Sequence, residues 1–393
     1  MSRPVLRTEF CKRVGIEYPV ILAGMGPVAG TGAPVATAEL AAAVSEAGGL
    51  GVIGGVAYSP DQLREQIRYV RSRTDKPFGV DLLLSPNFLA PRPKASGGRS
   101  APSNAPDPRD QLPREHVQAI QRIADELEIE LLEAPRQEGH MGSWVPEGQS
   151  WAGAQVEVIL EEEVPVFASG LGTPAPFADA LRANGTTILS LVGTVRAAQQ
   201  VAADGADYVV AQGTEAGGHT GRIGTLALLA QVRRAIAPTP VIAAGGIGDG
   251  HSLASVLAGG AEAAWCGTAF LVSEEANQPD LQKQRILDAA AEDTVVTRLY
   301  SGKTMRNIRN PLIDAWEREG LMALPMGAQA LLIRDLQYSI EQAGRHELLM
   351  NAAGQISGML SERRPARAIL EEMVAEAAAV FANELPKRIE ASV

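Results

Sequence analysis

The chain has 393 residues, longer than an average domain, but one α/β barrel of about 250 residues with additions would account for most of it. Its 35 basic and 46 acidic residues give a formal charge of −11, so it lacks the concentrated positive surface that nucleic acids or anionic membranes require. Neither class of partner is expected.

The N-terminus has no apolar segment of signal-peptide length, and no later segment is uncharged and apolar over about 18 residues. We therefore expect a cytoplasmic protein. The two cysteines, Cys11 and Cys266, are too few for a disulfide framework and lack a metal-binding spacing. Reduced thiols and no bound metal are the expectation.

Short apolar or β-branched runs alternate with helix-length segments along the chain. Eight runs predict strands, at residues 20–24, 50–55, 78–84, 164–170, 186–193, 207–213, 240–246 and 263–267. The intervening segments carry apolar residues at helical spacing, and several end in Gly or Asn-Gly. Strands that alternate with helices form parallel sheets, and eight such units with nearly continuous apolar strands favour a closed barrel. The sequence thus predicts an α/β fold, a (β/α)8 TIM barrel.

Two regions interrupt this alternation. Residues 85–163, after the third strand, hold a stretch dense in Pro, Gly, Ser and Asn and then an expected helix at 114–134. So long a connection is either a cover over the site or a spacer, and its place after a strand favours a cover at residues 85–150. We expect a barrel at 1–271 that includes this insertion, and a C-terminal extension with a helical subdomain at 272–393.

Three loops that should leave the same barrel face are rich in glycine. They follow the sixth, seventh and eighth strands and read QGTEAGGHTG, GGIGDG and CGTAF. The loops after the strands form the active-site face of a barrel, and phosphate sites after strands seven and eight recur there. Glycines that lead into helix starts offer free N–H groups to an anion, although one alone more often only tightens a turn. The two loops together favour a phosphate site, whereas GGIGDG lacks the spacing of a Rossmann fingerprint.

One histidine stands among these glycines. His219 lies in the sixth loop, and Glu215 precedes it by four residues. Imidazole titrates near neutral pH, so it can take a proton from a carbon acid or support developing negative charge. We expect His219 to be catalytic rather than a solvated loop residue, and Glu215 to fix the loop. Cys266 falls in the predicted eighth strand, which argues against a nucleophilic cysteine on a mobile loop.

The stretches GADYVVAQGTEAGGHTG, PVIAAGGIGDG and GAEAAWCGTAFL, with TRLYSGKTMRN and AAGQISGML further on, resemble the nitronate monooxygenase family, formerly called 2-nitropropane dioxygenases. The N-terminal YPVILAGMG and LAAAVSEAGGLGVIGG are also similar, so the resemblance covers nearly the whole chain except residues 85–163. It implies an FMN-dependent oxidoreductase that oxidises alkyl nitronates with O2 to a carbonyl compound and nitrite. An NAD(P)H-dependent reductase of quinones or enoyl thioesters on the same scaffold is the alternative, and a non-catalytic flavin-binding protein is a further one. The partners expected are small molecules, with a possible homodimer.

The resemblance also implies roles for individual residues around a non-covalent FMN. The backbone at Ala23, Gly24 and Met25 would face the flavin ring, and Gln212 would hydrogen-bond its polar side. Two glycines would lie close to the ring, Gly217 and Gly218. The phosphate would be held by Gly245, Gly246, Gly267 and Thr268.

The sequence departs from the family pattern in three places. Asp81 stands where the family usually has Asn, and an ionised Asp can only accept hydrogen bonds. Gly24 replaces a Pro that commonly precedes the Met, which leaves that turn less stiff. The long insertion is the third departure. Together they put the flavin contact of Asp81 and the substrate in doubt.

Overall fold

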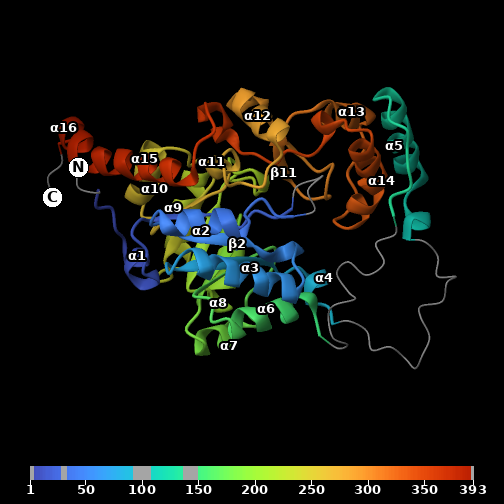
Figure 1. Cartoon of the computed structure of the whole chain (residues 1–393). Helices are drawn as coiled ribbons and strands as arrows, with labels where there is room; N and C mark the ends of the chain where they lie inside the picture. Colours follow the sequence, from blue (N-terminus) through green and yellow to red (C-terminus); the bar gives the residue numbers. More distant parts are fainter. Residues whose placement is uncertain (1–3, 28–32, 92–107, 136–148, 391–393) are drawn as a thin grey trace.

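The computed structural model describes residues 4–27, 33–91, 108–135 and 149–390 (Figure 1). Eight parallel strands lie in the order β1-β9-β8-β6-β5-β4-β3-β2, and a parallel bridge between Ile21 and Leu50 joins β1 to β2. This bridge closes the sheet, so the predicted TIM barrel is confirmed. All eight predicted strands are present: β1 Val20–Leu22, β2 Gly51–Gly54, β3 Phe78–Leu83, β4 Val166–Gly170, β5 Thr187–Val192, β6 Tyr208–Gln212, β8 Val241–Ala244 and β9 Ala264–Cys266.

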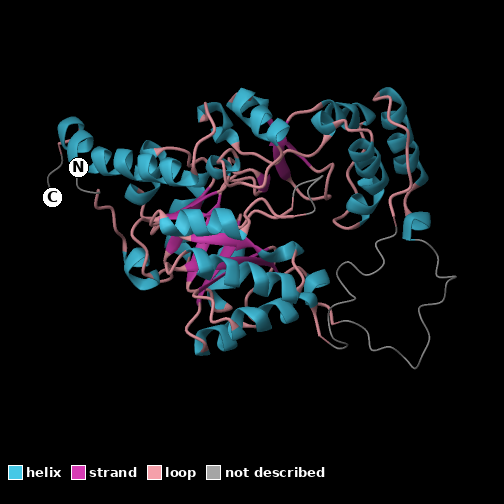
Figure 2. Ribbon diagram, in the orientation of Figure 1, coloured by secondary structure: helices cyan, strands magenta, loops and turns pink. Residues whose placement is uncertain are grey.

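Helices surround the strands, as Figure 2 shows. Successive strand residues face opposite sides: Ile21 packs in the barrel interior, while Val20 and Leu22 pack in the core beneath the helices. Both sides are buried, which explains the continuous apolar runs in the sequence. The helices that follow the first seven strands are α2 Ala38–Glu46, α3 Pro60–Arg73, α6 Trp151–Glu161, α7 Ala178–Ala183, α8 Val195–Ala203, α9 Thr225–Ala235 and α10 Gly250–Ala258.

The helix ring is completed from the C-terminus. Helix α15 (Ala366–Ala379) packs against both α2 and α10 and buries Leu370, Val374 and Ala377 in the barrel core. It therefore occupies the eighth position of the ring, although its sequence lies in the expected extension. The short helices α1 Glu9–Val14, α4 Pro86–Leu89, α11 Thr268–Leu271, α12 Asp280–Asp288 and α16 Leu385–Arg388 lie outside this ring.

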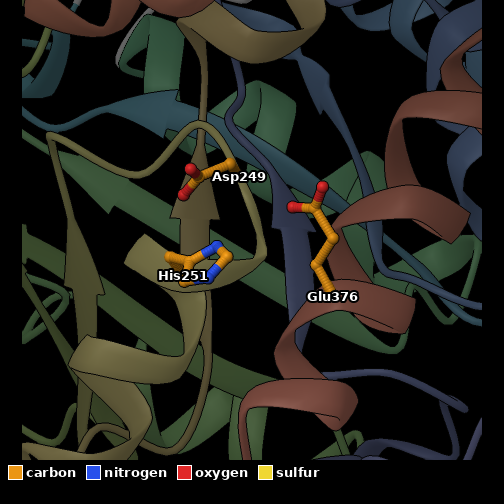
Figure 3. Close-up of side chains that lie close together, drawn as sticks. All are labelled: Asp249, His251 and Glu376. Atoms are coloured by element: carbon orange, nitrogen blue, oxygen red, sulfur yellow. The ribbon is translucent and has the colours of Figure 1, made fainter. Parts of the chain in front are cut away.

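The start of α10 is tied to α15 by carboxylates. Asp249 caps the helix by accepting a hydrogen bond from the Ser252 N–H (2.8 Å), and Glu376 of α15 accepts one from the Gly250 N–H (2.9 Å). His251 lies beside these two carboxylates (Figure 3). Negative charge is favourable at the positive end of the helix dipole, whereas a bound cation would be repelled there. Asp249 and Glu376 thus serve as helix caps, and Glu376 anchors α15 to α10, while the Nε2 atom of His251 lies 3.4 Å from Glu384.

The insertion and the C-terminal extension share a second hydrophobic core. Helix α5 (Arg114–Glu126) packs against α13 (Pro311–Glu319) and α14 (Ala328–Gln342), as Figure 1 shows. The prediction that this helix reaches residue 134 is wrong, because α5 ends at Glu126 and Glu128 takes a left-handed φ of 56°. Residues 92–107 and 136–148 of the expected cover lie outside the described residues, so the cover stays a prediction.

A small antiparallel sheet stands over the carboxyl ends of the barrel strands. It consists of β10 (Thr294–Thr297), β11 (Met305–Ile308) and β7 (Gly218–His219), in the order β10-β11-β7. The sixth barrel loop and the extension therefore meet at this sheet. The division of the chain at residue 272 into two domains stays a prediction. Within the described residues, no helix has the length and apolar character needed to cross a membrane.

Candidate functional site

A cavity of about 1050 Å³ opens where the barrel strands end. Its size is that of a pocket for a cofactor together with a small substrate. Every residue that the sequence analysis assigned to the site lines it: Ala23, Gly24, Met25, Asp81, Gln212, Gly217, Gly218, His219, Gly245, Gly246, Gly267 and Thr268. The structure thus brings all of them together, while the role of each stays a prediction.

Backbone amides of the seventh and eighth loops form a cradle on one side of the cavity. The N–H groups of Gly246, Ile247 and Gly267 have no acceptor among the residues that the structure describes. Gly246 has a left-handed φ of 74°, a conformation that glycine adopts without strain. The Thr268 hydroxyl accepts a hydrogen bond from the Gly354 N–H (2.9 Å), which leaves its own proton to donate. This set of donors suits an anion such as a phosphate.

The helix that follows the seventh strand does not contribute to this cradle. The expectation that the start of α10 offers free N–H groups is wrong, because Asp249 and Glu376 already accept from its first turn. The sequence could signal the Asp249 cap, which precedes the helix directly, but Glu376 is far away in the chain. An anion at this loop would therefore be held by the loop amides themselves.

His219 also lines the cavity and is held by two contacts. As part of β7 it pairs with Met305 of β11, and its Nε2 lies 2.8 Å from the hydroxyl oxygen of Ser301. Burial, and secondarily the charge of Lys303, lower the pKa of His219 below its usual value of 6.5. The ring is therefore neutral at pH 7 and able to accept a proton.

Glu215 fixes the loop that carries His219. Its carboxylate accepts hydrogen bonds from the N–H (3.0 Å) and the hydroxyl (2.8 Å) of Thr225, the first residue of α9. Next to it, Gly217 lies so close to the chain at Ala353 and Gly354 that an added Cβ atom would sit 2.7 Å from their backbone atoms. The expected structural role of Glu215 is confirmed, and the segment AAGQISGML is what the loop packs against.

Asp81 and Gly24, two departures from the family pattern, lie against each other. A Cβ atom added to Gly24 would be 2.2 Å from the Cβ of Asp81, so only glycine leaves room for this carboxyl group. Burial raises the pKa of Asp81 to about 8. At pH 7 its carboxyl is therefore neutral and can donate a hydrogen bond as well as accept one. The objection that Asp81 is an acceptor only does not hold at that pH.

Sequence reasoning missed several polar residues at the cavity, and four of them bear on its chemistry. Ser301 contacts His219, and three exposed cations, Arg222, Arg298 and Lys303, also line the cavity. None of these cations forms an ion pair with another residue in the described parts of the chain. The segment TRLYSGKTMRN contains three of the four, but nothing in it indicates that it folds back over the sixth loop. The cations make the cavity attractive to anions although the chain as a whole is acidic.

The cavity lies at the strand ends of a closed TIM barrel, where barrel enzymes have their active sites, and it brings free loop amides and a neutral histidine together. The chain belongs to the nitronate monooxygenase family, which it matches over residues 7–376. The enzymes of this family depend on a flavin.

Individual relatives match almost the full length of the chain. A Mycobacterium tuberculosis protein, provisionally named a monooxygenase, is 34% identical over 382 residues, which are 94% of this chain and 96% of the relative. The nitroalkane oxidase from Streptomyces ansochromogenes has a similar structure, with a TM-score of 0.74 and 30% identity over 95% of this chain and 98% of its own. FabK from Thermotoga maritima has a TM-score of 0.72 and 32% identity, over 98% of this chain and all of its own.

Proposed function

We propose that this protein is an FMN-dependent nitronate monooxygenase, which oxidises alkyl nitronates with O2 to a carbonyl compound and nitrite. One observation carries the proposal: the free amide cradle and the neutral His219 face the same cavity. The cradle suits the phosphate of the cofactor, and the histidine suits a substrate that is a carbon acid.

The residues of the cavity fit this cofactor. The amides of Gly246 and Gly267 would hold the phosphate, and the glycine at position 24 leaves room for the Asp81 carboxyl group at the cavity. Gln212 would meet the polar side of the flavin ring, and so would the carboxyl oxygen of Asp81 that has no partner among the described residues. When bound there, the flavin supplies the electron transfer from substrate to O2.

The chain itself supplies proton transfer and charge stabilisation. A neutral nitroalkane must lose the proton on the carbon beside its nitro group, and the neutral His219 is placed to accept it. The hydrogen bond to Ser301 fixes the orientation of the ring. The nitronate formed is an anion, and Arg222 and Lys303 provide positive charge at the cavity, with no carboxylate partner among the described residues.

The cofactor is tested by heating the purified protein and separating the released chromophore by chromatography. FMN is expected, and recovery of FAD, or of no flavin even after reconstitution, would contradict the proposal. The reaction is tested by anaerobic mixing of the flavin-loaded protein with propionate-3-nitronate, NADH and NADPH. Bleaching of the flavin by the nitronate supports the proposed activity.

The likeness to FabK favours a second candidate, an NAD(P)H-dependent reductase of enoyl thioesters or quinones on the same scaffold. The same mixing experiment separates the two activities. Bleaching by NADH or NADPH, with no response to the nitronate, would establish the reductase. If none of the three compounds bleaches the flavin, the result favours a non-catalytic flavin-binding protein.

A variant of Lys303 tests the charge at the cavity. Lys303→Gln is expected to raise KM about threefold to tenfold for propionate-3-nitronate, which carries two negative charges, and less for ethyl nitronate, which carries one. Steady-state oxygen consumption measures both constants. Arg234→Gln is the matched control, because Arg234 is exposed on α9 and does not line the cavity. Equal changes for both substrates would argue against an electrostatic role of Lys303.

A further inference from the structure

Asp81 is the one acidic side chain of the cavity that the fold itself does not use. Glu215, the other carboxylate there, is fully engaged at the start of α9. By contrast, the Oδ1 atom of Asp81 is buried and has no hydrogen-bond partner within the described chain. A buried polar atom without a partner is costly, so it is normally satisfied by a ligand or a water molecule.

The backbone around Asp81 is built to hold its carboxyl group at the cavity. The residue sits near the end of β3, between Gly54 of β2 and Ala168 of β4. Gly24 lies directly against it, with space for the carboxyl only because a side chain is absent there. Asp81, which lines the cavity, therefore has three small residues as neighbours. Gly54 and Ala168 lie on the adjacent strands, and Gly24 follows the end of β1.

We propose that Asp81 acts as a neutral carboxylic acid that donates a hydrogen bond to the polar edge of the bound flavin, and that loss of its proton weakens flavin binding and lowers the reduction potential of the flavin. This inference rests on the proposed flavin site. An aspartate on the surface would be ionised at pH 7, whereas the inference keeps Asp81 protonated at that pH. Asp81 is thereby a residue that tunes the cofactor with pH.

Burial favours the protonated form of Asp81, and the cations of the cavity, Arg222, Arg298 and Lys303, do not offset it. Gly54, Ala168 and Gly24, which pack against it from the three neighbouring segments, carry no charge, and burial alone raises the pKa of Asp81 to about 8. His219 is the other titratable group of the cavity in this range, but its pKa lies below 6.5. A transition near pH 8 is therefore distinct from the titration of His219.

The direction of the pH effect follows from the pKa of Asp81. Below pH 8 the acid keeps its proton and can donate it to the flavin. Above pH 8 a buried negative charge replaces the donor and opposes both the bound ring and the uptake of electrons by it. Because the neutral form falls to about one tenth at one pH unit above the pKa, flavin affinity should fall by about tenfold between pH 7 and pH 9.

The test measures the dissociation constant of FMN for the full-length protein between pH 6 and pH 9.5 by fluorescence quenching. For the unchanged protein we expect the constant to rise about tenfold between pH 7 and pH 9. Asp81→Asn should bind flavin with little dependence on pH, because asparagine keeps a donor and an acceptor but does not titrate. Asp81→Ala should bind more weakly at pH 7 and also show little pH dependence.

Two controls accompany this measurement. Glu157→Gln removes an exposed carboxylate on α6 that does not line the cavity. This variant should retain the pH profile of the unchanged protein. Reduction potentials measured on the same samples should fall more steeply with pH above 8 in the unchanged protein than in Asp81→Asn. Titration of the flavin itself affects both proteins equally, so the difference between them reports on Asp81.

The outcomes separate this inference from the proposed function. Parallel pH profiles for the unchanged protein and Asp81→Asn, in both affinity and potential, would overturn the role of Asp81 and leave the flavin enzyme intact. A chain that binds no flavin at any pH would overturn the proposed function, and this inference with it.

Discussion

Replacing His219 with asparagine is expected to lower kcat for neutral nitroalkanes by about 10²- to 10⁴-fold, the usual contribution of general acid–base catalysis. Asparagine preserves the approximate size and part of the hydrogen bonding to Ser301, so the variant should keep its flavin. The loss should be specific to proton abstraction, because the low pKa of His219 makes its neutral ring the base at pH 7.

The two substrate forms reveal what His219 does. A nitronate has already lost its proton, so its oxidation should suffer less than that of the nitroalkane if His219 serves only as a base. An equal loss on both would show that the ring also stabilises negative charge. Initial rates with nitroethane and with preformed ethyl nitronate measure the difference, and unchanged rates on both would leave His219 as a loop residue.

Replacing Gly246 with valine is expected to abolish most flavin binding while the barrel still folds. The left-handed φ of 74° does not suit a β-branched residue, and the new side chain would lie beside Glu215 at the amide cradle. If two charge-assisted hydrogen bonds to the phosphate are lost, each worth about 1.5–3 kcal/mol, the dissociation constant of FMN should rise at least about hundredfold.

Gly185→Val is the matched control for this variant. Gly185 also has a left-handed φ, of 79°, but it lies away from the cavity and has open space around it. Both variants should therefore lose some stability from backbone strain, and only Gly246→Val should lose flavin. Fluorescence titration with FMN measures this, and normal flavin occupancy in Gly246→Val would count against a phosphate at the cradle.

The barrel and the composition of its site could be predicted because their signals are local. Apolar runs mark strands that are buried on both sides, and residues at the ends of parallel strands meet at one face regardless of their distance along the chain. That rule brought Asp81, Gln212 and His219 to one cavity.

The remaining features depend on long-range packing, which leaves little trace in a sequence window. The contact between His219 and Ser301 spans 82 residues and exists because β11 folds back onto β7. The neutral state of Asp81 depends on the uncharged residues that the fold packs around it, so residue type alone suggested an ionised acceptor. The sequence did not reveal that α5 ends at Glu126, because apolar residues at helical spacing continue past Glu128, where the backbone leaves the helix.

The eighth ring helix has a consequence for how the chain is made. Helix α2 lies near the start of the chain, and its neighbour α15 is synthesised about 320 residues later. At a ribosomal rate of about 5–20 residues per second, this delay is roughly 16–64 s. During that time the apolar surface of α2 that packs against α15 is uncovered, and the matching surface of α10 is uncovered for the shorter time that the chain needs to reach α15. Both surfaces are open to aggregation until α15 is made. A message cut short before residue 366 would encode all the barrel strands and all the cavity residues but would lack the helix that completes the ring.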